Sequence, residues 1–305
     1  MQRRIVVAIN PQAAFGRARN AGARTVALLK AAGHDVRPLV APNYELLADR
    51  AREAIAGSPD AVVVVGGDGM AHLGVNLLAD TDIPLGLVPV GTGNDAALGL
   101  GLARHDVEAA VAQLLAALDA GGSRLDTGIA AWVEDGVPQR RRVLGAVSCG
   151  FDAIVNERAN RMRHPKGASR YTLALARELA RLRPIEYRIE WDGGAIEQSG
   201  ALVSVANNGS IGGGMRIVPE ASMTDGLLDL FIVEALGRIE FLRLYPLVFS
   251  GGHADDPRVT ILRTRRARVE ASGIVAYADG ERLGPLPIDV EVAPASLRML
   301  CPAIA

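Results

Sequence analysis

Short apolar runs alternate with amphipathic segments over about the first 125 residues of the chain. The apolar runs predict strands, and segments with apolar residues three or four positions apart predict helices. The predicted strands are Arg4–Ile9, His34–Val40, Ala61–Val65 and Leu85–Pro89, and the predicted helices are Ala21–Ala32, Tyr44–Ala56, a helix that ends at Leu78, and Val107–Leu118. The third strand is a run of valines without a polar position, which indicates that helices cover both of its faces. This part of the chain is therefore predicted to be a doubly wound α/β domain.

The pattern changes after Ala120–Gly128, a small and glycine-rich segment that we take as the domain boundary. Beyond it, short and often alternating strands follow one another with turns between them. The predicted strands are Ile129–Val133, Val143–Ser148, Glu186–Trp191, Gly200–Ala206, Leu227–Val233, Val259–Leu262, Ala267–Ala271 and Ile288–Val292. This pattern is typical of an antiparallel all-β domain, a sandwich or a barrel, which here is interrupted by helices.

Composition narrows the class of protein. The chain has 305 residues and a formal net charge of −1, so it has no overall basic field and we expect no nucleic-acid partner. Its cysteines, Cys149 and Cys301, are far apart, which suits a reducing cytoplasm and argues against a cysteine-based zinc site. The apolar run near the N-terminus is shorter than a signal-peptide core, and no stretch approaches the roughly 18 apolar residues of a membrane span. We therefore expect a cytoplasmic protein with no transmembrane segment.

Three special turns follow strands of the α/β domain. They are Asn10-Pro11 after the first strand, Gly66 to Gly69 after the valine strand, and Gly91 to Asp95 after the fourth strand. Ligands of doubly wound sheets bind at the carboxyl ends of strands, so these turns should line one cleft. Glycines let backbone N–H groups approach a phosphate closely, and the helices that follow point their positive ends at it. Together the turns predict a polyphosphate site.

Asp68 is the unexpected member of this group, because a carboxylate repels phosphate unless a cation lies between them. Magnesium binds carboxylates and phosphate oxygens together, so the turn predicts a nucleotide with its metal. A tight turn that caps a helix would explain Gly66 to Gly69 equally well, but the second glycine-rich turn favours the phosphate site. The chain has neither a P-loop motif nor a Gly-x-Gly-x-x-Gly after its first strand.

Five segments together resemble the diacylglycerol kinase catalytic-domain superfamily. They are NPQAAFGRA, GGDGMAHLGVNLL, GTGNDAALGLGL, NNGSIGGGMRIVPEASMTDGLLDLFIV and YADGERL, in the order and spacing of that family. The chain looks like the soluble bacterial branch, which is related to sphingosine and ceramide kinases. The resemblance implies an N-terminal domain like that of 6-phosphofructokinase and NAD kinase (residues 1–125), a C-terminal β-sandwich (126–292), and ATP bound between them. It also implies a tail, 293–305, that returns to the N-terminal domain.

The resemblance also implies roles for single residues. The ATP site would consist of Asn10, Pro11, Gly66, Gly67, Asp68, Gly69, Met70, Ala71, His72, Gly91, Thr92, Gly93, Asn94 and Asp95. Asp225, with backbone carbonyls near Ser222 and Leu227, would match a structural magnesium site. Asp68 would orient the magnesium of the active site, directly or through water. Asp279 or Glu281 would be the general base, and the resemblance does not decide between them.

Other interpretations of these motifs stay open. Asp225-Gly226 and Asp279-Gly280 are also favoured hairpin turns. The family usually has Ser-Gly where Ala13-Ala14 stand, Thr at Met70 and Asn at His72. His72 is therefore either an ordinary helix residue or a phosphate donor. Backbone N–H groups should keep the phosphate contacts at these positions.

The activity implied is that of an ATP-dependent lipid kinase, with diacylglycerol as the expected acceptor. The alternatives are an NAD kinase-like enzyme and a nucleotide-binding regulator without kinase activity. Its lipid would be met at the inner membrane surface, where the segment Ser169–Pro184 is a candidate contact because it has an apolar face opposite arginines. An ordinary helix packed on the β domain explains this segment as well. The sequence leaves a homodimer open.

Overall fold

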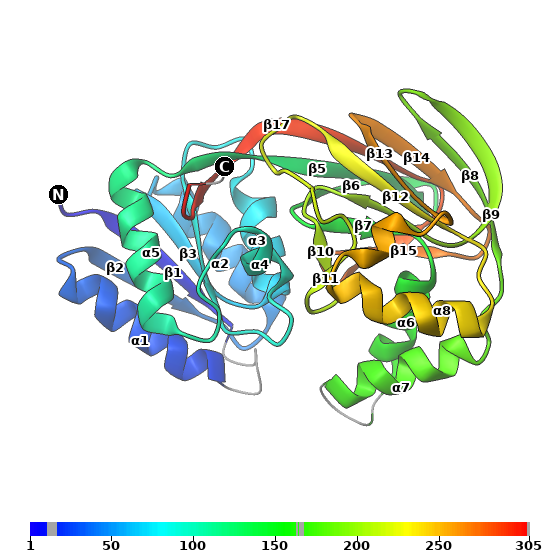
Figure 1. The fold of residues 1–305 in the computed structure, drawn as a ribbon. Helices are drawn as coiled ribbons and strands as arrows, with labels where there is room; N and C mark the ends of the chain where they lie inside the picture. Colours follow the sequence, from blue (N-terminus) through cyan, green and yellow to red (C-terminus); the bar gives the residue numbers. More distant parts are fainter. Residues whose placement is uncertain (11–16, 163, 165–167, 304–305) are drawn as a thin grey trace. The chain divides into compact units, whose positions relative to one another are not determined.

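The computed structural model describes residues 1–10, 17–162, 164 and 168–303 (Figure 1). The chain forms two compact units. Unit 1 contains Met1–Thr127 and Pro294–Ala305, and unit 2 contains Gly128–Ala293. Pro11, Ala13, Ala14 and Gly16, which belong to the first predicted turn, lie outside the described residues.

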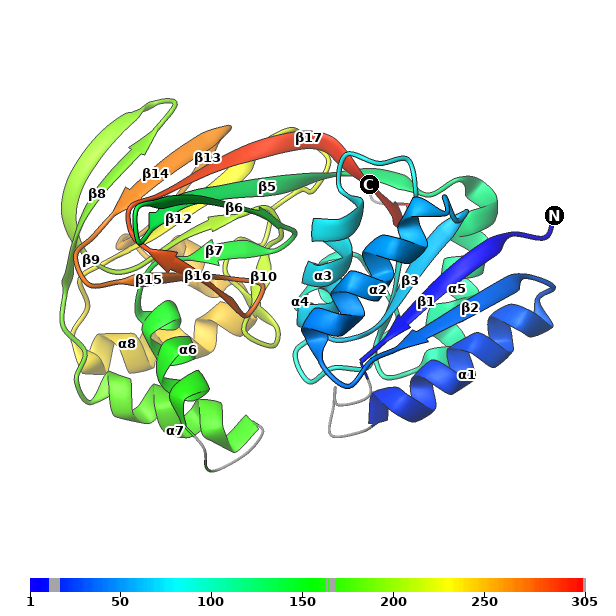
Figure 2. The same cartoon turned by 180° about the vertical axis from the view of Figure 1, so that it is seen from behind.

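Unit 1 is built on a parallel sheet. Its strands are β1 (Arg4–Ile9), β2 (Asp35–Val40), β3 (Ala61–Gly66) and β4 (Leu85–Pro89), in the order β2-β1-β3-β4, with the end of β17 (Ile288–Leu300) beside β4. Its helices are α1 (Arg17–Ala31), α2 (Tyr44–Ala56), α3 (Asp68–Leu78), α4 (Asp95–Gly99) and α5 (Val107–Ala120). Figures 1 and 2 show α1 and α5 on one face of the sheet and α2 and α3 on the other. Every residue of β3 is buried, so the prediction of a doubly wound α/β unit is confirmed.

Local signals set the ends of these helices. The Asn43 side chain accepts a hydrogen bond from the Leu46 N–H at the start of α2, and Asp106 does the same for the Ala109 N–H at the start of α5. α5 ends at Gly121, whose φ of 91° is open to glycine and strained for other residues. Such caps satisfy N–H and C=O groups that the helix itself leaves unpaired.

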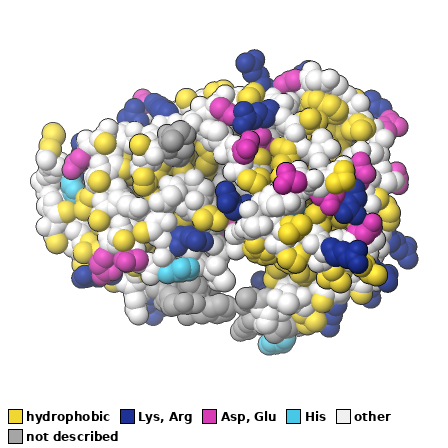
Figure 3. Space-filling model, viewed as in Figure 1, with side chains coloured by type: hydrophobic (Ala, Val, Ile, Leu, Met, Phe, Trp, Pro, Cys, Tyr) yellow, Lys and Arg dark blue, Asp and Glu magenta, His cyan; other side chains and the backbone are white. Residues whose placement is uncertain are grey.

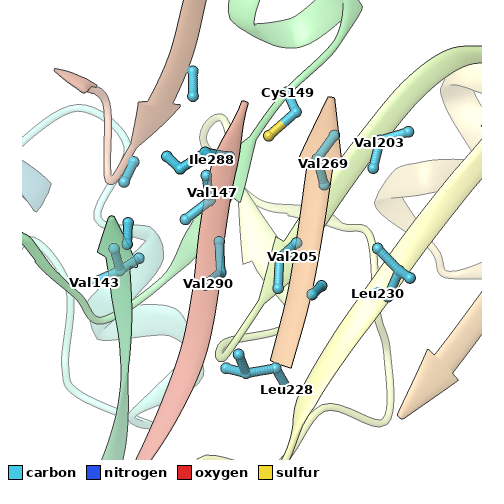
Figure 4. Packing of buried hydrophobic residues seen from close by; sticks show 14 of the residues in the cluster. Val143, Val147, Cys149, Val203, Val205, Leu228, Leu230, Val269, Ile288 and Val290 are labelled. Atoms are coloured by element: carbon cyan, nitrogen blue, oxygen red, sulfur yellow. The ribbon is translucent and has the colours of Figure 1, made fainter. Parts of the chain in front are cut away.

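Unit 2 is a β-sandwich with helices added. Its strands are β5 (Ser123–Glu134), β6 (Val137–Val143), β7 (Ala146–Ser148), β8 (Ile185–Trp191), β9 (Gly194–Ala206), β10 (Ser210–Ile211), β11 (Met215–Arg216), β12 (Leu228–Glu234), β13 (Val259–Thr264), β14 (Arg266–Glu270), β15 (Val275–Ala278) and β16 (Glu281–Pro285). Its helices are α6 (Phe151–Arg161), α7 (Ala168–Leu179), α8 (Arg238–Leu244), η2 (Tyr245–Phe249) and η3 (Gly252–Asp255). Inward side chains of several strands fill the core, with the buried thiol of Cys149 among them (Figure 4). The predicted sandwich is confirmed.

Several strands differ from their predicted bounds. β5 begins at Ser123, inside the segment predicted as a boundary, and β17 continues to Leu300. Both strands therefore start in one unit and end in the other. β6, with the polar sequence VPQRRRV, was not predicted, because its backbone bonds to β5 hold it while its side chains stay largely exposed. No helix among the described residues is long and apolar enough to cross a membrane.

Candidate functional site

Two glycine turns of unit 1 lie directly on each other. β1, β3 and β4 are parallel neighbours, so Asn10 and the turns that follow β3 and β4 emerge at the same edge of the sheet. A Cβ added to Gly91 would lie 2.5 Å from the Gly67 Cα, and one added to Gly67 would lie 3.0 Å from the Gly91 Cα. Because these contacts are with backbone atoms, any side chain at residue 91 would force the turns apart, and one at residue 67 would fit only tightly.

The Asp68 carboxylate joins the two turns. Its Oδ2 accepts a hydrogen bond from the Asn94 N–H at 2.9 Å, and its Oδ1 accepts one from the Ala96 N–H at 3.0 Å. Asp68 is the first residue of α3, and the N–H groups that it accepts belong to the start of α4. The carboxylate therefore holds the beginnings of two helices together, a role that was not predicted for it.

Asn94 closes the second turn from within. The residue is buried and adopts a φ of 58°, in the left-handed region. Its Oδ1 accepts the Gly91 N–H at 2.9 Å and its Nδ2 donates to the Gly91 carbonyl at 3.0 Å. Thr92, between them, is exposed. The turn thus has a fixed backbone and a side chain open to solvent.

Met70, Ala71 and His72 are buried in α3. The Asn76 amide nitrogen lies 3.2 Å from the His72 Nε2 and also donates to the His72 carbonyl at 2.9 Å. The His72 ring is thus turned toward a side chain of its own helix, one turn further along. These contacts favour the interpretation of His72 as a helix residue over that of a phosphate donor.

In unit 2, Asp279 and Glu281 occupy a hairpin between β15 and β16 with different surroundings. The Asp279 Oδ1 accepts the Gly145 N–H at 2.7 Å, and its Oδ2 accepts the Leu144 N–H at 3.1 Å. Asp279 itself has a φ of 52°. Glu281 begins β16 and is exposed. The first carboxylate is therefore built into the fold, whereas the second faces solvent.

The predicted magnesium site lies in another turn of unit 2. The Asp225 Oδ1 accepts the Leu227 N–H at 3.0 Å, and the Ser222 hydroxyl lies 3.2 Å from that of Thr224. Within the described part of the chain no three His, Cys, Asp or Glu side chains form a metal-binding group, so carbonyl oxygens would have to complete the site. An all-oxygen set with one carboxylate fits magnesium chemically.

Asp229 is a second carboxylate near Asp225, and the sequence did not lead us to expect it there. It is 6% exposed, on the apolar strand β12, and burial raises its pKa to about 6. The nearby Asp225 also raises the pKa, while Arg263, whose Nε lies 3.9 Å from the Asp229 Oδ1, lowers it. The carboxylate within the apolar sequence LDLFIV was the signal that could have found it. A second carboxylate close to Asp225 strengthens the fit to a cation.

An apolar pocket with a cavity volume of about 70 Å³ lies in unit 2. Helices α6, α7 and α8 and strands β9 and β12 contribute to its lining, which includes Phe151, Val155, Leu175, Phe231, Phe241 and Leu244. Asp152 and His253 add charged or titratable groups to this lining. Its lining has the apolar character of a binding site for an apolar ligand.

Asp152 and His253 are both buried. No described residue makes a well-aligned hydrogen bond to either Asp152 oxygen. Burial raises the pKa of the Asp152 carboxyl, although the Ser148 hydroxyl and N–H groups at the start of α6 partly oppose the rise. The His253 Nε2 lies 2.9 Å from the Ile217 carbonyl and carries a hydrogen there, while its Nδ1 has no partner among the described residues.

Comparison with known proteins agrees with both units. The family model "Diacylglycerol kinase catalytic domain" matches residues 4–122, and "YegS C-terminal NAD kinase beta sandwich-like domain" matches residues 145–301. Among solved structures, a putative diacylglycerol kinase from Bacillus anthracis is 21% identical with a TM-score of 0.78, and 99% of this chain and 95% of that one are covered. Yeast NADH kinase complexed with NADH is 12% identical with a TM-score of 0.57, covering 98% and 82% of the two chains. Fold and family models together define a kinase-type phosphotransferase.

Curated relatives identify the family. A diacylglycerol kinase of Mycobacterium tuberculosis is 38% identical over 305 residues, which is 98% of this chain and 95% of the relative. A diacylglycerol kinase of Bacillus subtilis is 29% identical over 241 residues, or 78% of this chain and 76% of the relative. The chain belongs to the diacylglycerol kinase family.

Proposed function

We propose that the chain transfers the γ-phosphate of ATP to the hydroxyl group of a membrane lipid, with diacylglycerol as acceptor and phosphatidic acid as product. The observation that carries a lipid acceptor is the apolar cavity of unit 2, which suits acyl chains and offers a dinucleotide few hydrogen-bond partners. The name of the relative that is 38% identical supports diacylglycerol as the lipid.

ATP binds at the paired turns of unit 1. N–H groups of the turn Gly66 to Gly69 and those of Thr92 and Gly93 would face the phosphates, because the Gly91 N–H is already bonded to Asn94, and α3 adds the positive end of its dipole. Asn10 lies at the same sheet edge, and Met70 to His72 support the turn from inside α3. Asp68 keeps the two turns in register through its bonds to Asn94 and Ala96.

Magnesium supplies positive charge that neutralises the phosphoryl group in transfer. By positioning the turns, Asp68 also orients the metal that accompanies the nucleotide. A second, structural magnesium would be held by the Asp225 carboxylate with backbone carbonyls near Ser222 and Leu227, and the buried Asp229 would add negative charge nearby.

Glu281 accepts the proton of the lipid hydroxyl. Both Asp279 oxygens already accept backbone N–H groups, so they are less available for proton transfer. Glu281, two residues further along the chain, is exposed. Asp279 thus shapes the loop that presents Glu281, and the two carboxylates have different roles.

Radiolabelled ATP tests the proposal. Purified protein is incubated with the γ-labelled nucleotide and magnesium, with either a total lipid extract or NAD as acceptor. Label in the organic phase, on a product that migrates with phosphatidic acid, is expected. Label in NADP would support an NAD kinase-like enzyme instead, and no transfer to either acceptor would support a regulator without kinase activity.

A further inference from the structure

The segment that contains α8 and η2, residues 238–249, has apolar side chains exposed to solvent. Ile239 is 68% exposed, Leu242 57%, Leu247 44% and Phe249 47%. The other large apolar side chains that are exposed in the described chain are spread over the termini, hairpins and single positions of both units. Four such residues within eleven positions form a patch, which marks an interaction surface rather than ordinary exposure.

The opposite side of the same segment is apolar as well. Phe241, Leu244, Tyr245 and Val248 line the cavity of unit 2. A surface helix of a globular protein has one apolar and one polar face, whereas a helix that is apolar on both sides is covered on both. The segment therefore separates the apolar cavity from a second apolar environment on its outer side.

Exposed basic residues lie on α8 itself and on the neighbouring segment around the end of α7. Arg238 and Arg243 lie on α8 and are exposed, and a depression lined by Leu182, Pro184 and residues 235–238 joins the start of α8 to the end of α7. Arg177, Arg181 and Arg183 of this neighbouring segment are exposed too. Figure 3 shows dark blue side chains among yellow ones over the part of unit 2 where Figure 1 draws α8.

Two acidic residues of this region, Glu240 and Glu178, are already paired with other arginines. Glu240 accepts the Gly237 N–H and forms an ion pair of 3.0 Å with Arg258, and Glu178 is paired with Arg158. None of the five arginines on these segments has a carboxylate within ion-pair distance in the described part of the chain. The surface therefore combines apolar side chains with uncompensated positive charge.

We propose that α8 and η2 are the membrane-docking surface of this chain and that their occupant is the interface of a bilayer that contains anionic lipid. Apolar side chains of the patch insert below the headgroups, and the arginines contact lipid phosphates. The proposal rests on the proposed function, because docking would let the lipid acceptor pass this segment and reach the cavity behind it. A twofold dimer through the same face is disfavoured, since it would bring each arginine group near its own copy.

The segment Ser169–Pro184, which the sequence offered as a membrane contact, packs its apolar face inside unit 2 instead. Its apolar residues Leu175, Leu179 and Leu182 pack against the cluster around α6. The interpretation of this segment as a helix packed on the β unit is therefore the better one for its apolar face. Its arginines remain available to the surface formed by α8 and η2.

Vesicle co-sedimentation of the full chain tests the surface. Vesicles of phosphatidylcholine with phosphatidylglycerol should bind the protein, and Ile239→Asn with Leu242→Asn should weaken binding by about tenfold or more, because two large apolar side chains no longer insert. The matched control is Val133→Asn with Val137→Asn, which removes side chains that are 58% and 55% exposed on the β5–β6 hairpin and should leave binding unchanged. Arg238→Gln with Arg243→Gln should weaken binding to vesicles with phosphatidylglycerol more than to vesicles of phosphatidylcholine alone.

Kinetics separate this proposal from the proposed function. The Ile239 and Leu242 variant should lose kcat/KM for diacylglycerol in vesicles and keep it for a short-chain diacylglycerol dispersed as monomers. If neither substrate is phosphorylated by the wild type but the variant still loses vesicle binding, the surface stands and the proposed function fails. Unchanged vesicle binding by the variant overturns the surface, as does a wild-type dimer that the substitutions dissociate while vesicle binding persists.

Discussion

Two carboxylates of one hairpin, Asp279 and Glu281, differ in what surrounds them. Glu281→Gln should lower the rate of phosphoryl transfer by about 100-fold or more and leave the free energy of unfolding unchanged, because it removes a base from an exposed position. Asp279→Asn should lower the free energy of unfolding by about 1–3 kcal/mol, because the N–H groups of Leu144 and Gly145 lose a charged acceptor.

Kinase assays and urea denaturation of both variants check this prediction. The assignment of the base would be wrong if Glu281→Gln kept its activity while Asp279→Asn lost activity without loss of stability.

Asp152 should make stability depend on pH. Burial raises the pKa of its carboxyl above the ordinary value of 3.8, so the native state holds a proton over a range in which the unfolded state has lost it. The free energy of unfolding therefore falls as pH rises through this range. Asp152→Asn cannot ionise and should therefore gain stability relative to the wild type as pH rises from 4, near the ordinary pKa, to 8.

Thermal unfolding of both proteins at the two pH values measures the difference. Asp256→Asn is a useful control with the opposite sign, because Arg258 holds the pKa of Asp256 at about 2. Its stabilising effect is complete above pH 4 and is lost only as pH falls toward 2. Equal differences between wild type and Asp152→Asn at pH 4 and pH 8 would show that the pKa of Asp152 is not raised in the native state.

At the scale of elements, the starts of α3 and α4 are held together by one side chain, that of Asp68. Asp68→Ala removes the acceptor for the Asn94 and Ala96 N–H groups, so the start of α4 should loosen while the sheet stays intact. Hydrogen exchange should quicken at the amides of residues 94–98 and stay slow in β3, and phosphoryl transfer should be lost.

A substitution at Asp95 is the control for the hydrogen-exchange result of Asp68→Ala. Asp95→Ala removes a carboxylate from the same short helix without touching the Asp68 bonds, so it should leave exchange at Ala96 nearly unchanged. Retention of slow exchange in Asp68→Ala would show that the carboxylate does not hold the turns together.

Elements with a strong local pattern were predicted well, and those held by distant partners were not. The helix Tyr44–Ala56 and the strand Leu85–Pro89 have the predicted bounds, since caps and apolar runs are local signals. β6 was missed because it depends on β5 for its backbone bonds. At the candidate site the glycines were recognised, but the contact between Gly67 and Gly91 and the bond from Asp68 to α4 join positions that no short motif relates.

At the scale of the whole molecule, net charge hides the distribution of charge. The chain carries a formal charge of −1, yet five exposed arginines lie on α8 and on the segment next to its start. Binding to anionic vesicles should therefore weaken as ionic strength rises, because salt screens exposed charges separated by more than about 8–10 Å. Co-sedimentation over a series of salt concentrations measures this, and binding that does not change with salt would exclude a contribution from the arginines.

The final strand of the fold has a consequence for synthesis on the ribosome. Met299 and Leu300 of β17 pair with Leu85 and Gly86, and the Ser296 carbonyl accepts the Asp80 N–H at 2.7 Å. Residues 294–303 are made after all of unit 2, so a nascent chain exposes the edge of β4 until translation reaches them. A fragment that stops at Thr127 would keep that edge open permanently, and we expect it to aggregate where the full chain does not.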